Sequence, residues 1–191
     1  MLILASESPR RRQLLSLITT NFSVIISEVD ETTPPGMSAA DTVMLLAGRK
    51  AETVLAGRPG DIIIGADTLV ECDGEILGKP QDTKDAARML RFLSGKKQIV
   101  YTGVCVIADG KRYNWHEEST VLFHKLTEAE IQEYIATGEP MDKAGAYGIQ
   151  EKGSLLVQRI EGDYFNIMGL PIAGLYRVLR NHTSINAFTA G

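Results

Sequence analysis

Residues 61–68 read Asp-Ile-Ile-Ile-Gly-Ala-Asp-Thr and contain the most apolar β-branched run of the chain. Three consecutive isoleucines, Ile62–Ile64, are typical of a central strand that is covered on both faces. We expect Asp67 to lie just past the end of this strand, where open α/β sheets bind their ligands. A carboxylate there needs a metal, a basic partner or a hydrogen bond, and a simple cap of the local turn explains this segment equally well.

The segments on either side of this run predict alternating strands and helices. Leu2–Ala5 is a short apolar run that predicts a buried strand, and Ser8 with Pro9 predicts the N-cap and first residue of a helix. The other expected elements are a strand over Phe22–Ser27, a helix from a Ser38/Asp41 capping box to about Ala56, and helices over Thr83–Leu93, Thr127–Thr137 and Pro171–Leu179.

Two Asp-Gly pairs predict tight turns between antiparallel strands. Asp73-Gly74 separates Leu69–Cys72 from Glu75–Leu77, and Asp109-Gly110 separates two longer strand-like segments. Together with the helices, these hairpins predict the α/β class, with a mixed twisted sheet and flanking helices.

Length and composition indicate one enzyme-sized domain. The chain has 191 residues, 44% of them hydrophobic, which is enough for one well-formed core and too little to suggest two. We assign residues 1–180 to this domain and residues 181–191 to a C-terminal tail. The net charge of −4 argues against nucleic acid polymers as partners, so an anionic substrate must be bound locally.

The cysteines and the apolar segments predict a cytoplasmic protein. Cys72 and Cys105 are too few for a disulfide framework and lack metal-ligand spacing, which favours a reducing compartment. The apolar stretch Met1–Ala5 is too short for a signal-peptide core, and no run of about 18 apolar residues occurs. We therefore expect no membrane partner.

The segment from Ser6 to Arg12 combines groups that bind phosphate oxygens. Hydroxyls at Ser6 and Ser8, a helix N-terminus and the guanidiniums of Arg10 and Arg11 follow a strand directly. The alternative is an ordinary capped helix with a solvated basic first turn. Because basic residues there oppose the helix dipole, we favour phosphate binding.

Four other positions are candidates with common structural alternatives. Lys79, in Gly78-Lys79-Pro80, and Lys50, within an amphipathic helix, are either site cations or surface lysines. Glu31 follows Asp30 in an acidic loop that suits Mg²⁺ or is merely solvated. The glycine-rich stretch Asp142–Gln150 either lies against a ligand, with the Gln150 amide as a contact, or forms a long surface loop, which we favour slightly from this segment alone.

Several catalytic patterns are absent from the sequence. No HExxH or GxSxG occurs, so zinc peptidase and serine hydrolase chemistry lack support. Neither GxxxxGK[ST] nor GxGxxG is present, which argues against kinases, motor-type NTPases and dinucleotide-binding enzymes.

Taken in order, segments of the chain from Leu2 to about Leu179 resemble the Maf family of nucleotide pyrophosphatases. The stretch Asp142–Gln150 and the later Gly169-Leu170-Pro171 resemble the branch that acts on dTTP and UTP. The other matching segments are Leu4-Ala5-Ser6, Ser8-Pro9-Arg10-Arg11, Asp30-Glu31, Leu46-Ala47, Lys50-Ala51, Gly65-Ala66-Asp67-Thr68, Gly78-Lys79-Pro80, Leu93-Ser94-Gly95, Tyr101-Thr102-Gly103 and Gly138-Glu139-Pro140.

The resemblance implies a fold akin to the inosine triphosphate pyrophosphatases, with two lobes and a central cleft, dependence on Mg²⁺ or Mn²⁺, and a homodimer. It implies Asp67 as proton acceptor and Arg10, Thr68 and Gln150 as residues that select the nucleotide. Its other polar site positions are Ser8, Glu31, Lys50 and Lys79. The chain departs from the family at Gln98, where a histidine is common, and at Glu151, where a glycine is common.

The expected activity is hydrolysis of dTTP and UTP to the monophosphate and pyrophosphate. Glu31 and Asp67 would hold the metal, with Lys50, Lys79 and Arg10 neutralising the phosphates, and whether Asp67 acts as base, metal ligand or both stays open. Two alternatives stay open: the same chemistry on modified or 7-methylated nucleotides, and a non-catalytic nucleotide-binding regulator of cell division.

Overall fold

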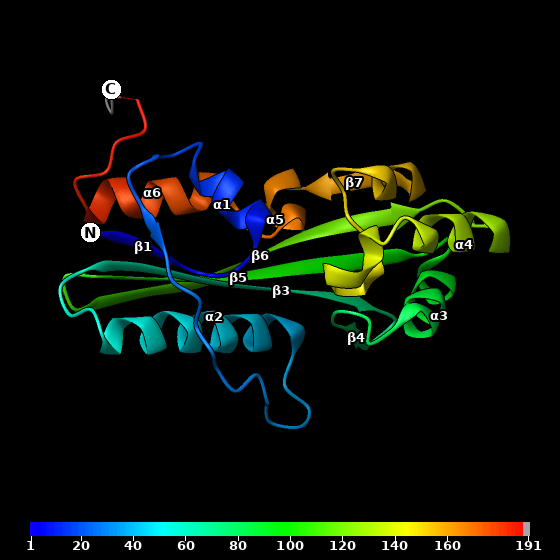
Figure 1. The fold of residues 1–191 in the computed structure, drawn as a ribbon, viewed down its shortest axis with the longest axis horizontal. Coiled ribbons are helices and arrows are strands. Elements are labelled where there is room, and N and C mark those ends of the chain that lie inside the picture. The colour runs from blue at the N-terminus through cyan, green and yellow to red at the C-terminus, as the bar shows by residue number, and fades with distance from the viewer. Residues whose placement is uncertain (189–191) are drawn as a thin grey trace. The chain divides into compact units, whose positions relative to one another are not determined.

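Strands and helices alternate along residues 1–188, the part of the chain that the computed structural model describes (Figure 1). The strands are β1 (Leu2–Ala5), β2 (Ser23–Val24), β3 (Ile62–Cys72), β4 (Glu75–Leu77), β5 (Lys97–Ala108), β6 (Lys111–Phe123) and β7 (Val157–Gly162). Hydrogen-bonded neighbours follow the order β2-β1-β3-β5-β6-β7, with β4 added to β3. β1 pairs in parallel with β2 and β3, whereas β4 and β7 pair antiparallel with β3 and β6. The sheet is therefore mixed, and the expected α/β class with flanking helices is confirmed.

The chain divides into two compact units. Unit 1 contains Met1–Asp67, Thr102–Glu117 and Gly169–Gly191, and unit 2 contains Thr68–Tyr101 and Glu118–Met168. Three boundaries of the units fall within β3, β5 and β6, and the fourth follows α5 (Tyr164–Met168). The single domain over residues 1–180 with a tail over 181–191 stays a prediction, and positions 189–191 of that tail lie outside the described residues.

In unit 1, helices flank the strands on both sides. Its helices are α1 (Pro9–Leu15), α2 (Ala39–Ala56) and α6 (Ile172–His182). In Figure 1, α2 lies on one side of β1 and β3, and α1 and α6 lie on the other. Ile3 and Ile63, both 0% exposed, pack in one apolar cluster with Ala47 and Ala51 of α2. These contacts fix α2 against the strand that carries Asp67.

Two glycines let the backbone of α2 lie directly against β3 and β5. A Cβ atom at Gly65 would lie 2.1 Å from the Ala47 carbonyl oxygen and 2.9 Å from the Ala51 nitrogen. A Cβ atom at Gly103 would lie 2.3 Å from the Val43 carbonyl carbon and oxygen. Any larger residue would push the helix away, because real Cβ contacts are never so short. The close approach places Lys50, which precedes Ala51, beside Asp67, which follows Gly65.

Unit 2 has its own core and its own helices. These are α3 (Thr83–Leu93), α4 (Glu128–Ala136) and α5 (Tyr164–Met168), together with the single turns η1 (Glu139–Asp142), η2 (Ala144–Ala146) and η3 (Lys152–Leu156). Leu90, Phe123, Ile131 and Tyr147 belong to one buried cluster. The core thus joins α3, α4 and β6 to the segment around η2.

Side-chain caps account for the helix starts that the sequence predicts. Ser8, Ser38 and Thr127 each accept a hydrogen bond from the backbone three residues ahead. At Thr127 the full capping box with Glu130 is present. At Ser38 the hydroxyl bonds to the Asp41 carboxylate, at 2.7 Å. These caps satisfy amide groups that would otherwise lack partners.

Both predicted Asp-Gly turns are confirmed. Asp73 and Gly74 have φ values of 50° and 81°, and Asp109 and Gly110 have 50° and 71°. Positive φ at both central residues is the conformation for which Asn or Asp followed by Gly is favoured. The turns join β3 to β4 and β5 to β6.

Three expectations about elements are corrected, and two elements were not expected. Asp67 does not lie past a strand end, because β3 continues through it to Cys72. The strand expected over Phe22–Ser27 covers only Ser23–Val24, since β1 offers just two register partners there. The last helix runs to His182, whose ring stacks on Tyr113 at 4.1 Å. The sequence pattern also did not predict β7 or α5.

No helix within residues 1–188 combines the length and apolar character needed to cross a membrane.

Candidate active site

A lysine joins two carboxylates in unit 1. The Nζ atom of Lys50, on α2, lies 2.5 Å from Oδ1 of Asp67 on β3 and 2.8 Å from Oε1 of Glu31. The side chains of Lys50 and Asp67 are 13% and 11% exposed, whereas that of Glu31 is 62% exposed. The ammonium therefore compensates a largely buried negative charge, and the loss of either partner would leave the other uncompensated.

Arg11 adds a second partly buried cation near these carboxylates. Its guanidinium donates to the Ser6 hydroxyl at 3.2 Å and to the carbonyls of Ala66 and Gly169, both at 2.8 Å. Burial lowers the pKa of Arg11, while the charges of Asp67 and Glu31 raise it. Because a guanidinium keeps its proton in proteins, Arg11 is a fixed positive charge beside Asp67.

The hydroxyls before α1 organise the start of that helix. Ser8 is the N-cap and accepts from the Arg11 amide, at 3.4 Å. Ser6 is 7% exposed, and its oxygen accepts from the Ser8 amide as well as from Arg11. Arg10 is half-buried, and its charge contributes to lowering the pKa of Arg11. The capped-helix interpretation is thus correct for Ser8, and it leaves phosphate binding as a proposal.

The loop that carries Glu31 is bound by a residue that sequence reasoning missed. Arg49, on α2, donates to the carbonyls of Asp30 at 2.9 Å and Thr32 at 2.6 Å, on either side of Glu31. The Asp30 carboxylate also accepts from the Thr32 amide at 2.8 Å, and hydrogen bonds from the Thr32 side chain and backbone hold the pKa of Asp30 below its usual value. No local pattern marks Arg49, because its partners lie 17 and 19 positions away.

Glu31 and Asp67 are the residues of unit 1 best placed to hold a metal. Both present carboxylate oxygens, which hard divalent cations prefer, and both point at the same Nζ atom. Across residues 1–188 there is no group of three or more His, Cys, Asp or Glu that forms a metal site by itself. A cation held here would therefore take its remaining ligands from water or substrate.

The remaining predicted residues belong to unit 2. Thr68 follows Asp67 in β3, and Lys79 is an exposed residue in the turn after β4. The carbonyl of Gly78 accepts from the Gly145 amide at 3.0 Å, so this turn is bonded to the segment that leads to Gln150. The structure thus brings Ser6, Arg11, Glu31, Lys50 and Asp67 together in unit 1, and it separately places the Lys79 turn next to the glycine-rich segment in unit 2.

The stretch Asp142–Gln150 is not a surface loop. Ala146, Tyr147 and Ile149 are buried, and the Tyr147 ring packs edge-on against Phe123 at 4.6 Å. Gln150 and Glu151 are exposed. The preference for an ordinary surface loop is therefore wrong. Within Asp142–Gln150, every apolar residue is buried or half-buried.

The two departures from the family pattern lie in different surroundings. Gln98 is 1% exposed, and its amide lies beside the Tyr147 hydroxyl without a hydrogen bond of good geometry. Burial raises the pKa of Tyr147, so its phenol stays protonated. Glu151 is exposed next to Gln150. Gln98 therefore belongs to the interior of unit 2.

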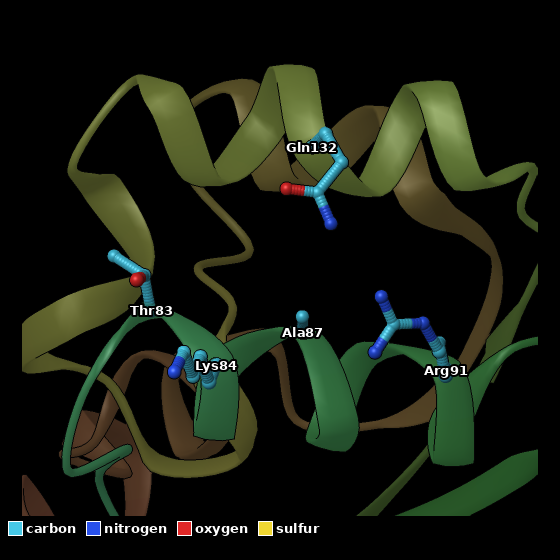
Figure 2. Close-up of a pocket in the computed structure, with 5 residues that line it drawn as sticks. All are labelled: Thr83, Lys84, Ala87, Arg91 and Gln132. Atoms are coloured by element: carbon cyan, nitrogen blue, oxygen red, sulfur yellow. The ribbon is translucent and has the colours of Figure 1, made fainter.

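A hollow of about 190 Å³ between α3 and α4 contains none of the predicted site residues (Figure 2). It is lined by Thr83, Lys84, Ala87, Arg91 and Gln132. The two polar groups that point into it are already engaged, since Arg91 and Gln132 both bind Glu128. We assign no chemistry to this hollow.

The fold and unit 1 define an α/β protein in which Lys50 pairs with two carboxylates and Arg11 lies nearby, an arrangement suited to an anionic substrate and a hard metal ion. A family model described as Maf-like protein matches residues 1–182. The chain belongs to this family.

Close relatives share almost the entire chain. A dTTP/UTP pyrophosphatase of Bacillus cytotoxicus is 51% identical over 182 residues, which is 95% of each chain. A dTTP/UTP pyrophosphatase of Bacillus mycoides is 49% identical over 183 residues, which is 96% of each chain. Among solved structures, the Staphylococcus aureus Ham1 protein matches with a TM-score of 0.56 and 14% identity, over 94% of this chain and 98% of that one. At that identity the likeness concerns the fold alone.

Proposed function

We propose that this protein is a nucleoside triphosphate pyrophosphatase that hydrolyses dTTP and UTP to the monophosphate and pyrophosphate. The names of relatives at about half identity over nearly the whole chain support the substrate. One structural observation supports the chemistry: Lys50 joins Asp67 and Glu31 in unit 1, beside the partly buried guanidinium of Arg11. This cluster supplies the charges that a phosphate anhydride requires for hydrolysis.

Glu31 and Asp67 fit the role of metal ligands. Mg²⁺ is usually bound by one or two protein carboxylates, and water and substrate phosphates complete its octahedral shell. The two carboxylates converge on the Lys50 ammonium, so a metal would bind beside that group through oxygens of both residues, without a third protein ligand. When bound, Mg²⁺ or Mn²⁺ would neutralise phosphate charge and acidify a coordinated water molecule.

Asp67 is the proposed proton acceptor of the reaction. The oxygen of a water molecule attacks the α-phosphorus, the bond from that phosphorus to the bridging oxygen breaks, and pyrophosphate leaves with the bridging oxygen. The proton of the water passes to the Asp67 carboxylate, which β3 and Lys50 hold in place. Lys50 keeps a positive charge at the reacting centre throughout.

The other predicted residues are proposed to bind the substrate. Arg10 and Arg11 neutralise phosphates together with the hydroxyls of Ser6 and Ser8, and the resemblance to the Maf family supports Lys79 as a further cation for phosphate groups. Thr68 and Gln150 contact the nucleoside, for which a side-chain amide offers both a donor and an acceptor to a pyrimidine base. The resemblance to the Maf family further supports a homodimer in the cytoplasm.

The proposal is tested with a panel of nucleotides and either Mg²⁺ or Mn²⁺, in water enriched in ¹⁸O. We expect monophosphate and pyrophosphate from dTTP and UTP, with ¹⁸O in the monophosphate, because the water attacks the α-phosphorus. Label in the pyrophosphate would place the attack at the β-phosphorus. Diphosphate with orthophosphate as products would overturn the bond assignment.

The variant Asp67→Asn tests the assigned base. We expect turnover to fall by about 10²–10⁴-fold, because an amide accepts no proton and binds the metal poorly. Asp73→Asn is the matched control, since Asp73 forms an exposed ion pair with Lys96 in a turn of unit 2. A folded Asp67→Asn protein with full turnover would remove Asp67 from catalysis.

A further inference from the structure

We propose that Tyr134 and Glu139 form a clamp that fixes the backbone on both sides of Gln150, and that they are positioning residues for base selection. The inference rests on the proposed function, in which Gln150 contacts the nucleoside. The clamp lies wholly within unit 2. It is defined by the side chains of Tyr134, on α4, and Glu139, at the start of η1.

Hydrogen bonds tie this pair to both flanks of the segment. The Tyr134 hydroxyl donates to Oε1 of Glu139 at 2.9 Å and accepts from the Gly148 amide at 3.1 Å. The Glu139 carboxylate accepts from the amides of Lys152 and Gly153, each at 3.1 Å. Backbone on both sides of residues 149–151 is thus bound to the same two side chains.

Glycines allow the two flanks to meet at the clamp. A Cβ atom at Gly153 would lie 2.3 Å from the Gly148 carbonyl oxygen and 2.5 Å from the Tyr134 hydroxyl. A Cβ atom at Gly148 would lie 2.6 Å from Cε of Lys143. At Gly153 the nearest atom is backbone, so space, and not an unusual backbone conformation, requires glycine there; at Gly148 a larger residue would have to displace the Lys143 side chain.

The charge state of the clamp suits a permanent contact. Tyr134 is 5% exposed, and burial raises the pKa of its phenol, so the hydroxyl stays protonated and donates to Glu139. A carboxylate that accepts several hydrogen bonds, two of them from backbone amides, is a strong and directional anchor. Lys143 adds a bond from its Nζ to the Glu139 carbonyl, at 2.7 Å.

Gln150 depends on this anchor for its place. It is exposed, whereas Tyr147 and Ile149 before it are buried. An exposed side chain takes its position from the backbone that carries it, and here that backbone is held at Gly148 and again at Gly153. Loosening the clamp should therefore alter how Gln150 meets a base without touching the carboxylates of unit 1.

Tyr134→Phe tests the proposal, because it removes one oxygen atom and both of its hydrogen bonds. We expect the ratio of kcat/KM for dTTP over CTP to fall about fivefold, the equivalent of roughly one hydrogen bond, mainly through KM. Hydrogen exchange at the amides of Gly148 and Gly153 should become faster. Tyr176→Phe is the matched control, since that hydroxyl bonds to Asn186, at 3.0 Å, in unit 1.

The same change in a Gln150→Ala background shows whether Tyr134 acts through Gln150. We expect no further loss of selectivity there, because the positioned group is gone. Faster exchange with unchanged selectivity would overturn the positioning role, and unchanged exchange would overturn the clamp itself. A parent protein without pyrimidine triphosphatase activity would instead refute the proposed function, and the exchange measurement would still test the clamp.

Discussion

Arg49 and Lys50 are consecutive residues that hold the same loop by different means. The ammonium of Lys50 binds the Glu31 carboxylate, and the guanidinium of Arg49 binds the carbonyls on either side of it. Glu31 is more than half exposed, so its backbone would otherwise be free to move. Both neighbours therefore restrain the loop that carries Glu31, the proposed metal ligand.

Arg49→Met should therefore weaken metal binding. We expect the affinity for Mn²⁺ to fall about tenfold, as when a group that orients a ligand is removed, while kcat at saturating metal changes little. Electron paramagnetic resonance of free Mn²⁺ measures this affinity without substrate. Arg58→Met, just beyond the end of α2, is the control, and an unchanged affinity in Arg49→Met would show that the loop needs no such support.

At this scale the sequence predicted the charged groups but not the residues that hold them. Lys50, Asp67 and Glu31 were named as candidates, and the structure joins them. Arg49 and Tyr134 had no signal, because each acts through backbone atoms of a segment more than ten positions away. Such partners follow from tertiary packing, which no local pattern encodes.

Among the elements, α2 owes its position to glycine. In Gly65→Ala, the added Cβ atom would lie 2.1 Å from the Ala47 carbonyl oxygen of α2, which is too close for two non-bonded atoms. We expect a loss of roughly 1–3 kcal/mol in the free energy of unfolding, together with reduced turnover, because Lys50 moves away from Asp67. Urea denaturation and pyrophosphate release measure the two effects.

Gly57→Ala provides the control for that substitution. Gly57 ends α2, and a Cβ atom there would meet its nearest neighbour, the Val54 oxygen, at 4.0 Å. We expect stability within about 0.5 kcal/mol of the parent. Equal stability of the Gly65 and Gly57 variants would contradict the close packing of α2.

Elements that capping or turn residues delimit in the sequence were predicted well, and elements without such residues were not. Thr83–Leu93 begins after an Asp82 cap, and its bounds match the prediction. β3 was predicted too short, since polar residues at Asp67, Thr68 and Glu71 interrupt the apolar run. β7 is an edge strand whose residues are mostly exposed, so it lacks the apolar alternation that marks a half-covered strand.

For the molecule as a whole, each unit contains one of the two cysteines. Cys105 lies in unit 1 and Cys72 in unit 2, and both are free and buried. Burial raises the pKa of both thiols, that of Cys105 from 9.0 to about 11. Because the folded state disfavours the thiolate, burial of the protonated Cys105 thiol stabilises the fold below pH 9. This stabilisation is lost as the pH rises through about 11.

Thiol labelling should therefore report the opening of each unit separately. We expect Cys72→Ala and Cys105→Ala proteins, each with one thiol, to resist labelling at pH 8 and to react in a single shared urea transition. The reason is that β3, β5 and β6 each contribute residues to both units. Two separate transitions, detected by absorbance of the released reagent, would show that the units unfold independently.

The two Asp-Gly turns offer a practical use of the fold. A Cβ atom at Gly74 or Gly110 would meet nothing within 4 Å, and the first turn belongs to unit 2 and the second to unit 1. A short epitope spliced into either hairpin tip would extend into solvent without displacing core side chains. Each unit thus has its own exposed turn at which an inserted tag for antibodies, dyes or tethers is tolerated.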